Sequence, residues 1–153
     1  MIAQPIKRSE YLKPLSREHH HGLLVCWKIR MGLKKNVSIN RIKAFTDWFY
    51  ENHLKEHFEL EENYIFPILG MEHDLVKKAI TEHKRLRRLF LDTSHIENSI
   101  SLIEEELEKH IRFEERVLFM EIDKIASEQQ LQKIEHIHNC LSLETNWKDE
   151  FWA

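Results

Sequence analysis

The segments HFELEENYIF (residues 57–66) and HIRFEERVLF (residues 110–119) repeat one pattern at a distance of 53 residues. Each segment has a His, two consecutive Glu and a Phe at the same offsets, and the first Glu follows the His by four residues. Residues four apart are neighbours on one face of an α-helix, with Cβ atoms about 5–6 Å apart. We therefore expect both segments to be helical, with each His and Glu directed at one point.

A shorter repeat accompanies the first one. The dipeptide Glu18-His19 precedes residues 57–66, and Glu82-His83 lies between the two long segments. In an antiparallel pair of helices, His83 near the start of one helix would lie at the height of His57 near the end of the other. The repeats therefore predict that all four segments meet at one level.

Apolar residues recur at helical spacing along nearly the whole chain, and Gly and Pro are scarce, with three of each. Four long helices with short connections predict an all-α protein, an antiparallel up-down four-helix bundle. An extra short C-terminal helix follows, and we expect the aromatic tail at residues 147–153 to dock on the bundle. The predicted helices cover residues 16–33, 42–66, 74–91, 96–125 and 127–143.

Local signals set the expected ends of the first two helices. Ser16, just after Pro14, is a favourable N-cap for the first helix, and Ser38 or Asn40 can cap the second. Pro67 and Gly70 are expected to end the second helix.

Length and composition predict one domain over residues 1–153, with the bundle at about 14–125 and the C-terminal helix and tail at about 126–153. The net charge of -3 gives no basic excess for binding nucleic acid. No apolar run is long enough to span a membrane, and residues 1–10 lack the apolar core of a signal peptide. The two cysteines, Cys26 and Cys140, do not form a disulfide framework, so we expect a cytoplasmic protein.

Histidine is the commonest metal ligand, and the chain has 11. In each His-x-x-x-Glu pair the carboxylate can bridge two metal ions while the imidazole binds one of them, and bundle cores hold such carboxylate-bridged sites. The sequence thus predicts a two-metal site with six ligands: His19, His57, Glu61, His83, His110 and Glu114.

Several neighbouring histidines leave alternatives open. His20 competes with His19, because a shift of one residue would exchange them. His53 precedes His57 by four residues and could supply a fifth nitrogen ligand, or it could contact a ligand residue without binding the metal itself. His21 is expected to point away from the site.

Two glutamates next to predicted ligands and two histidines near the C-terminus also have to be assigned. Glu62 and Glu115 each follow a predicted ligand and could take over its carboxylate role. His136 and His138 belong to the C-terminal helix, and we expect both to be exposed outside the bundle.

In their order and spacing these residues resemble the hemerythrin-like (HHE cation-binding) family. The family pattern of His, His-x-x-x-Glu, His, His-x-x-x-Glu is matched by the six predicted ligands. The opening Leu15-Ser16-Arg17-Glu18-His19 and the Glu-Glu-x-x-x-Phe-Pro segment at residues 61–67 are also similar to the family's. The resemblance covers residues 14–121 and implies a non-haem, carboxylate-bridged centre of two Fe ions. It also implies O2, nitric oxide or peroxide as small ligands, in binding, sensing or iron handling.

The chain departs from the oxygen-carrying members of that family. Carriers have a pair of histidines four apart on the third helix, whereas Ala79 and Arg87 flank His83 at that spacing. Fewer nitrogen ligands leave more open metal positions, which favours sensing, redox chemistry or iron handling over simple O2 carriage.

Other functions remain open as well. One is a metal-stabilised interaction module that binds a partner through the C-terminal helix and tail, and another is a di-iron redox enzyme. Zn or another divalent metal would also suit these ligands in a purified sample. No nucleophile or base motif points to hydrolysis, so binding is favoured over catalysis.

Overall fold

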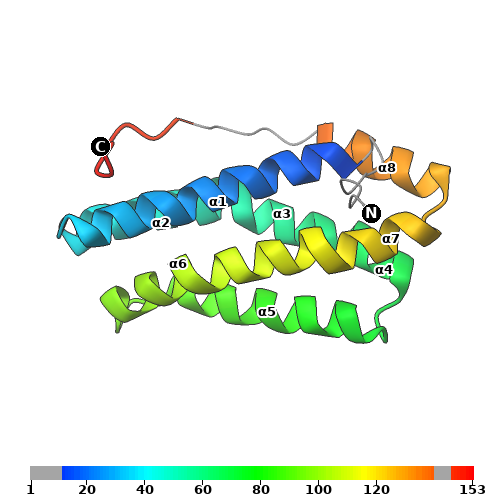
Figure 1. Cartoon of the computed structure of the whole chain (residues 1–153), viewed down its shortest axis with the longest axis horizontal. Coiled ribbons are helices and arrows are strands. Elements are labelled where there is room, and N and C mark those ends of the chain that lie inside the picture. Colours follow the sequence, from blue (N-terminus) through cyan, green and yellow to red (C-terminus); the bar gives the residue numbers. More distant parts are fainter. Residues whose placement is uncertain (1–11, 140–145) are drawn as a thin grey trace, which may run out of the picture.

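The computed structural model describes residues 12–139 and 146–153. Within these residues the regular secondary structure is helical, and no strand is present. The described chain forms five continuous helical segments that pack as a bundle (Figure 1). Among the described residues, no helix combines the length and apolar character needed to cross a membrane.

Two of the five segments are single α-helices of the bundle, α1 (Lys13–Lys34) and α5 (Asp74–Leu91). The second segment is interrupted twice by π-helical turns. It consists of α2 (Ile39–Phe49), η2 (Tyr50–Leu54), α3 (Lys55–Leu60), η3 (Glu61–Ile65) and α4 (Phe66–Leu69).

The fourth segment contains one π-helical turn and the fifth contains none. The fourth consists of α6 (Ile96–Phe113), η4 (Glu114–Leu118) and α7 (Phe119–Ile125), and the fifth is α8 (Glu128–Asn139). The range predicted for the third helix agrees with α5, and the range predicted for the fourth agrees with α6 to α7. Residues 140–143 of the predicted last helix, including Cys140, lie outside the described residues.

Three predicted helix boundaries are wrong, and one of them is the start of the second helix, which begins at Ile39 and not at Ile42. The first helix begins at Lys13, not at Ser16, because Pro14 fits the first turn of a helix, where no backbone N–H is needed. The second helix continues past Pro67 and ends at Leu69, before Gly70, whose φ of 100° an L-residue rarely adopts. The predicted cap Ser38 does precede α2, although its side chain makes no capping hydrogen bond.

Two apolar clusters fill the bundle, one toward each end. The first contains Phe45, Phe49, Phe90 and Leu107, and the second contains Leu12, Phe66, Val76, Phe119 and Ile134. The buried charged residues of α1, α3, η3, α5, α6 and η4 lie between these clusters. The fold therefore encloses a polar layer in an otherwise apolar core.

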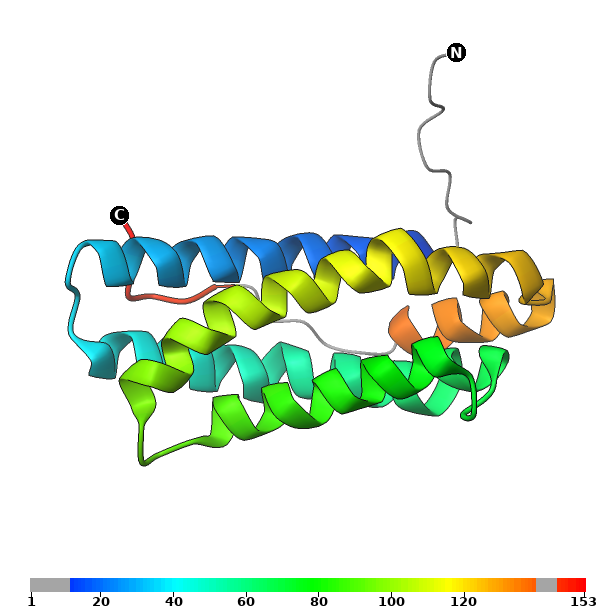
Figure 2. The ribbon, with the colours of Figure 1, turned by 60° about the horizontal axis from the view of Figure 1, so that its bottom comes forward.

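The C-terminal tail packs on the bundle, as the sequence predicts. Phe151 is only 3% exposed, and its ring lies 5.3 Å from that of Phe45, between ring centroids. The contact needs Gly32, because a Cβ there would lie 2.8 Å from the Phe151 ring. Figure 2 shows this tail at the opposite end of the bundle from α8.

Candidate metal centre

The structure brings all six predicted ligands into one buried cluster. Their side-chain donor atoms form two groups of four, in each of which all four atoms lie within 4.8 Å of one another. Glu61 and Glu114 belong to both groups, and each group adds two histidines. The first group adds His19 and His57, and the second adds His83 and His110.

Each shared carboxylate contacts one histidine of each group. Oε1 of Glu61 lies 3.3 Å from Nε2 of His57 and 3.3 Å from Nε2 of His83. Oε1 of Glu114 lies 3.1 Å from Nε2 of His19 and 3.2 Å from Nε2 of His110. Both glutamate side chains are fully buried. Each shared carboxylate therefore lies between the two donor groups.

A second set of four carboxylates holds the outer nitrogen of every histidine. The Nδ1–Oε distances are 2.5 Å for His57–Glu18, 2.7 Å for His110–Glu82, 2.8 Å for His19–Glu115 and 2.6 Å for His83–Glu62. When Nδ1 donates to a carboxylate, Nε2 has its lone pair free for a metal. The outer carboxylates thus orient all four Nε2 atoms inward.

The helix backbone changes at both shared glutamates. The π-helical turn η3 begins at Glu61, and η4 begins at Glu114. Such turns are rare and occur frequently at functional sites. The repeat read in the sequence therefore extends to the backbone geometry of the two segments.

The cluster fits a metal ion because most of its inner atoms lack a regular hydrogen bond, whereas Nε2 of His19 and Nε2 of His57 lie 3.0 Å from each other. Both oxygens of Glu61 and of Glu114, and Nε2 of His83 and of His110, are buried without a regular hydrogen bond to any described residue. Burying such polar groups unpaired is costly. Imidazole nitrogens together with carboxylate oxygens are a donor set suited to iron and zinc. These residues could hold metal ions.

Without a metal ion, protons bound to the histidines offset the negative charge of the buried carboxylates. Burial lowers the pKa of His110, but the negative charge of Glu114, 3.2 Å from Nε2, and the hydrogen bond to Glu82 outweigh it and raise this pKa to about 10. Neighbouring carboxylates also raise the pKa of His19 and His57 against the effect of burial. In turn, His110 and His19 hold the pKa of Glu114 well below its usual range although burial raises it.

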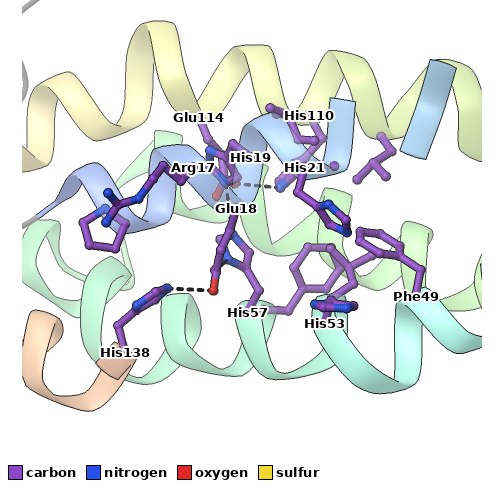
Figure 3. A pocket seen from close by; sticks show the side chains of 16 residues that line it. Arg17, Glu18, His19, His21, Phe49, His53, His57, His110, Glu114 and His138 are labelled. Atoms are coloured by element: carbon purple, nitrogen blue, oxygen red, sulfur yellow. Dashed lines mark hydrogen bonds and ion pairs between the residues drawn. The ribbon is translucent and has the colours of Figure 1, made fainter. Parts of the chain in front are cut away.

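The prediction that His138 is exposed is wrong, because this residue of α8 reaches the cluster. Its Nε2 lies 2.6 Å from Oε1 of Glu18, the carboxylate that also holds His57, and its side chain is only 10% exposed (Figure 3). Burial raises the pKa of Glu18, but its hydrogen bonds and charge interactions with His138 and His57 lower it to about 2. His136 is exposed, as predicted.

The structure also separates the alternatives that the sequence left open. His19 is buried in the cluster, whereas His20 is exposed. His53 joins neither group of donor atoms and lies beside His21, with ring centroids 5.1 Å apart. Burial is the largest cause that lowers the pKa of His21 to about 4, and the nearby His53 adds to it.

The four outer carboxylates have a role that sequence reasoning did not assign. Glu62 and Glu115 lie on the outer side of His83 and His19, so neither replaces its neighbour as the shared carboxylate. Glu18 and Glu82 were recognised only as parts of a repeated dipeptide. The signal that could have identified them is the matching Glu before His19 and before His83.

A cavity of about 200 Å³ adjoins the cluster. It touches His19, His57, His110 and Glu114 of the cluster, and Arg17, which also lines it, is exposed. Figure 3 shows Glu18 and His57 among the side chains that line this cavity. The cluster is therefore buried but borders on free space.

Comparison with known proteins gave no match, whether with protein-family models, with curated proteins or with solved structures. The fold and the site by themselves define an all-helical protein with a buried His–Glu cluster that could hold metal ions.

Proposed function

We propose that this chain is a non-haem di-iron protein of the hemerythrin-like type, which binds or senses O2, nitric oxide or peroxide or handles iron. The observation that carries the proposal is the pair of donor groups, each with two histidines, which share Glu61 and Glu114. When bound there, two iron ions would supply open positions for a small ligand and a change of oxidation state.

The proposal includes the antiparallel up-down arrangement of four helices. The colours in Figure 1 support it, since α1 and α5 run from the α8 end of the bundle and the intervening segment runs back toward it. α6 packs against both α1 and α5. This arrangement accounts for the meeting of residues 57–66 and 110–119 with the two Glu-His dipeptides.

Aromatic rings pack against two of the four histidines and surround them with apolar surface. Phe58 stacks on His83 with ring centroids 3.7 Å apart, and Phe119 stacks on His19 at 5.1 Å. Both phenylalanines are buried. An apolar surround of this kind controls solvent access and the electrostatics of a metal site.

The surroundings of His83 favour sensing or redox chemistry over simple carriage of O2. Arg87, four residues after His83, lies 2.8 Å from Glu62 and over the Phe58 ring. Ala79, four residues before His83, is buried and has no donor atom. Neither position supplies a further nitrogen ligand, so each donor group keeps two histidines.

Metal analysis of the protein, with optical spectra, tests the proposal. After growth with added iron and aerobic purification, we expect about two iron ions per chain and a charge-transfer band. Adding O2, peroxide or nitric oxide to the reduced protein should change the spectrum. One zinc ion per chain, or no metal at all, would contradict the proposal.

A double variant tests the shared carboxylates. Replacing both Glu61→Ala and Glu114→Ala should abolish the binding of two metal ions, because each group would lose both of its carboxylates. Glu105→Ala with Glu106→Ala is a suitable control, since both glutamates are on α6 and pair with Lys109 and Arg85, not with a histidine of the cluster. Retention of two metals in the first variant would show that the bridging roles are wrong.

A further inference from the structure

The cavity next to the cluster is larger than a diatomic molecule or a peroxide needs. Its volume is about 200 Å³, whereas an apolar cavity of about 150 Å³ in another protein accommodates benzene. Most of its wall is apolar or aromatic, with Gly22, Phe49, Leu54, Phe58, Leu107 and Ile111 among the lining residues. The space and the wall together suit an organic molecule of about one ring.

Aromatic rings gather at one side of this cavity. His21 lies 5.7 Å from Phe49 and 5.1 Å from His53, between ring centroids, and Phe49 lies 5.8 Å from His53. Figure 3 shows these three rings together, away from Arg17 and His138. Tilted and offset packing at such distances is the geometry that aromatic rings favour, and a bound ring would extend it.

One polar atom in this wall has no function in the cluster. Nε2 of His21 is buried and has no hydrogen-bond partner among the described residues. His21 belongs to neither donor group, although it lines the cavity. A buried polar atom without a partner is costly, and a ligand that hydrogen-bonds to it would remove that cost.

We propose that this cavity binds a small neutral aromatic molecule whose one polar group hydrogen-bonds to His21. The apolar part of the wall around Phe49, Leu54 and Phe58 disfavours a charged ligand there, because burying an unpaired charge costs far more than burying a neutral polar group. The site would place the ring of the ligand beside the metal cluster. It goes beyond the proposed function and does not depend on the identity of the metal.

Phenol and toluene test the proposal, because they are similar in size and differ in the hydroxyl group. We expect phenol to bind the full chain with a Kd of about 1 mM or tighter, measured by saturation-transfer NMR and by the rise in Tm. Toluene should bind about two- to tenfold more weakly, the range for one net hydrogen bond. The measurements are made on metal-free and on metal-loaded protein, so that coordination of phenol to a metal is recognised.

Two variants locate the binding site. His21→Phe keeps a ring in the wall and should remove the preference for phenol over toluene while toluene still binds. Leu54→Trp should fill the cavity and abolish binding of both, provided that its circular dichroism spectrum stays helical. His20→Phe is the matched control, because His20 is the exposed neighbour of His21 and does not line the cavity.

Three results would overturn the proposal. They are an absence of phenol binding up to about 20 mM, equal binding of phenol to the wild type and to His21→Phe, and stronger binding of benzoate than of phenol. The last result would assign the site to anions held by Arg17. Phenol binding by a protein that takes up no iron would support the aromatic site and contradict the di-iron function.

Discussion

Nε2 of His138 lies 2.6 Å from Oε1 of Glu18, and this contact connects α8 to the buried His–Glu cluster. The other oxygen of Glu18 lies 2.5 Å from Nδ1 of His57. On the matching side of the cluster, Glu82 holds His110 in the same way, but its further partner is Lys78 at 3.4 Å, which is half exposed. The two halves of the cluster therefore differ in their outermost partner.

This difference predicts unequal effects of two alanine variants. His138→Ala should weaken metal binding by up to about tenfold, the lower end of the range for outer partners of metal ligands, because Glu18 would then hold His57 less firmly. Lys78→Ala should change the affinity by no more than about twofold, because an exposed ion pair contributes little. Competition with a chelator of known affinity measures both. Equal losses in the two variants would show that the contact with α8 has no special influence.

The outer carboxylates themselves should have a larger effect. In Glu82→Gln the amide can no longer accept from Nδ1 of His110 as a charged group, so we expect metal affinity to decrease by about 10- to 100-fold. Glu106→Gln is the control, because Glu106 pairs with Arg85 on the neighbouring surface of α5 and α6. The same chelator competition applies, and an unchanged affinity of Glu82→Gln would contradict the role given to these carboxylates.

Metal binding should release protons. The pKa of His110 is raised from 6.5 to about 10 in the metal-free fold, so its imidazole is protonated at pH 7 and must lose that proton to bind a metal through Nε2. Titration calorimetry at pH 7 in buffers of different ionisation enthalpy measures the number of protons released. We expect at least one per chain, and an apparent enthalpy independent of the buffer would contradict this.

The same pKa predicts how the stability of the metal-free protein depends on pH. Because the folded-state pKa of His110 is raised, its contribution is fully present below pH 6.5 and is lost as the pH rises toward about 10. The Tm difference between metal-loaded and metal-free protein should thus widen from pH 6.5 to pH 9. A difference that narrows over this range would show that His110 is not stabilised in its charged form.

At the far end of the bundle, Gly32 and Phe151 should show strong non-additivity. Gly32→Ala should destabilise the protein by about 1–3 kcal/mol, because the added Cβ would lie 2.8 Å from the Phe151 ring. Phe151→Ala alone should cost about 3 kcal/mol as a buried aromatic ring is lost. In the double variant Gly32→Ala should destabilise much less, since the contact with Phe151 is gone, only the flexible end of the Ile42 side chain stays close at 3.0 Å, and alanine favours the helix. Urea unfolding of all four proteins measures this cycle, and additive losses would refute the contact.

Helical periodicity predicted much of the fold because it is a local signal. The apolar spacing around Ile100 and Ile111 places these residues on one buried face, and the structure confirms this. The start at Lys13 was missed because the favourable cap residue Ser16 competed with the fit of Pro14 in a first turn. Capping preferences are weak beside the packing of Leu12 and Leu15 in the core.

The meeting of the six cluster residues was predictable because i, i+4 spacing and repeat length are written in the sequence. The contact of His138 with Glu18 was not, because it joins residues 120 positions apart and depends on how α8 folds back. The π-helical turn at Glu61 was also missed, since no residue type specifies one. Metal binding itself stays a prediction.

The wide turns at Glu61 and Glu114 make the cluster sensitive to chain length as well as to residue type. A wide turn accommodates one residue more than an α-helical turn, and each residue of an α-helix rotates the chain by about 100°. Deleting one exposed residue within Glu61–Ile65, such as Asn63, would therefore let the helix close into regular α-geometry while Phe66 and the residues after it keep nearly the same orientation. Such a protein would retain every ligand and every apolar side chain, and the local placement of the Glu61 carboxylate at the wide turn would be what changes.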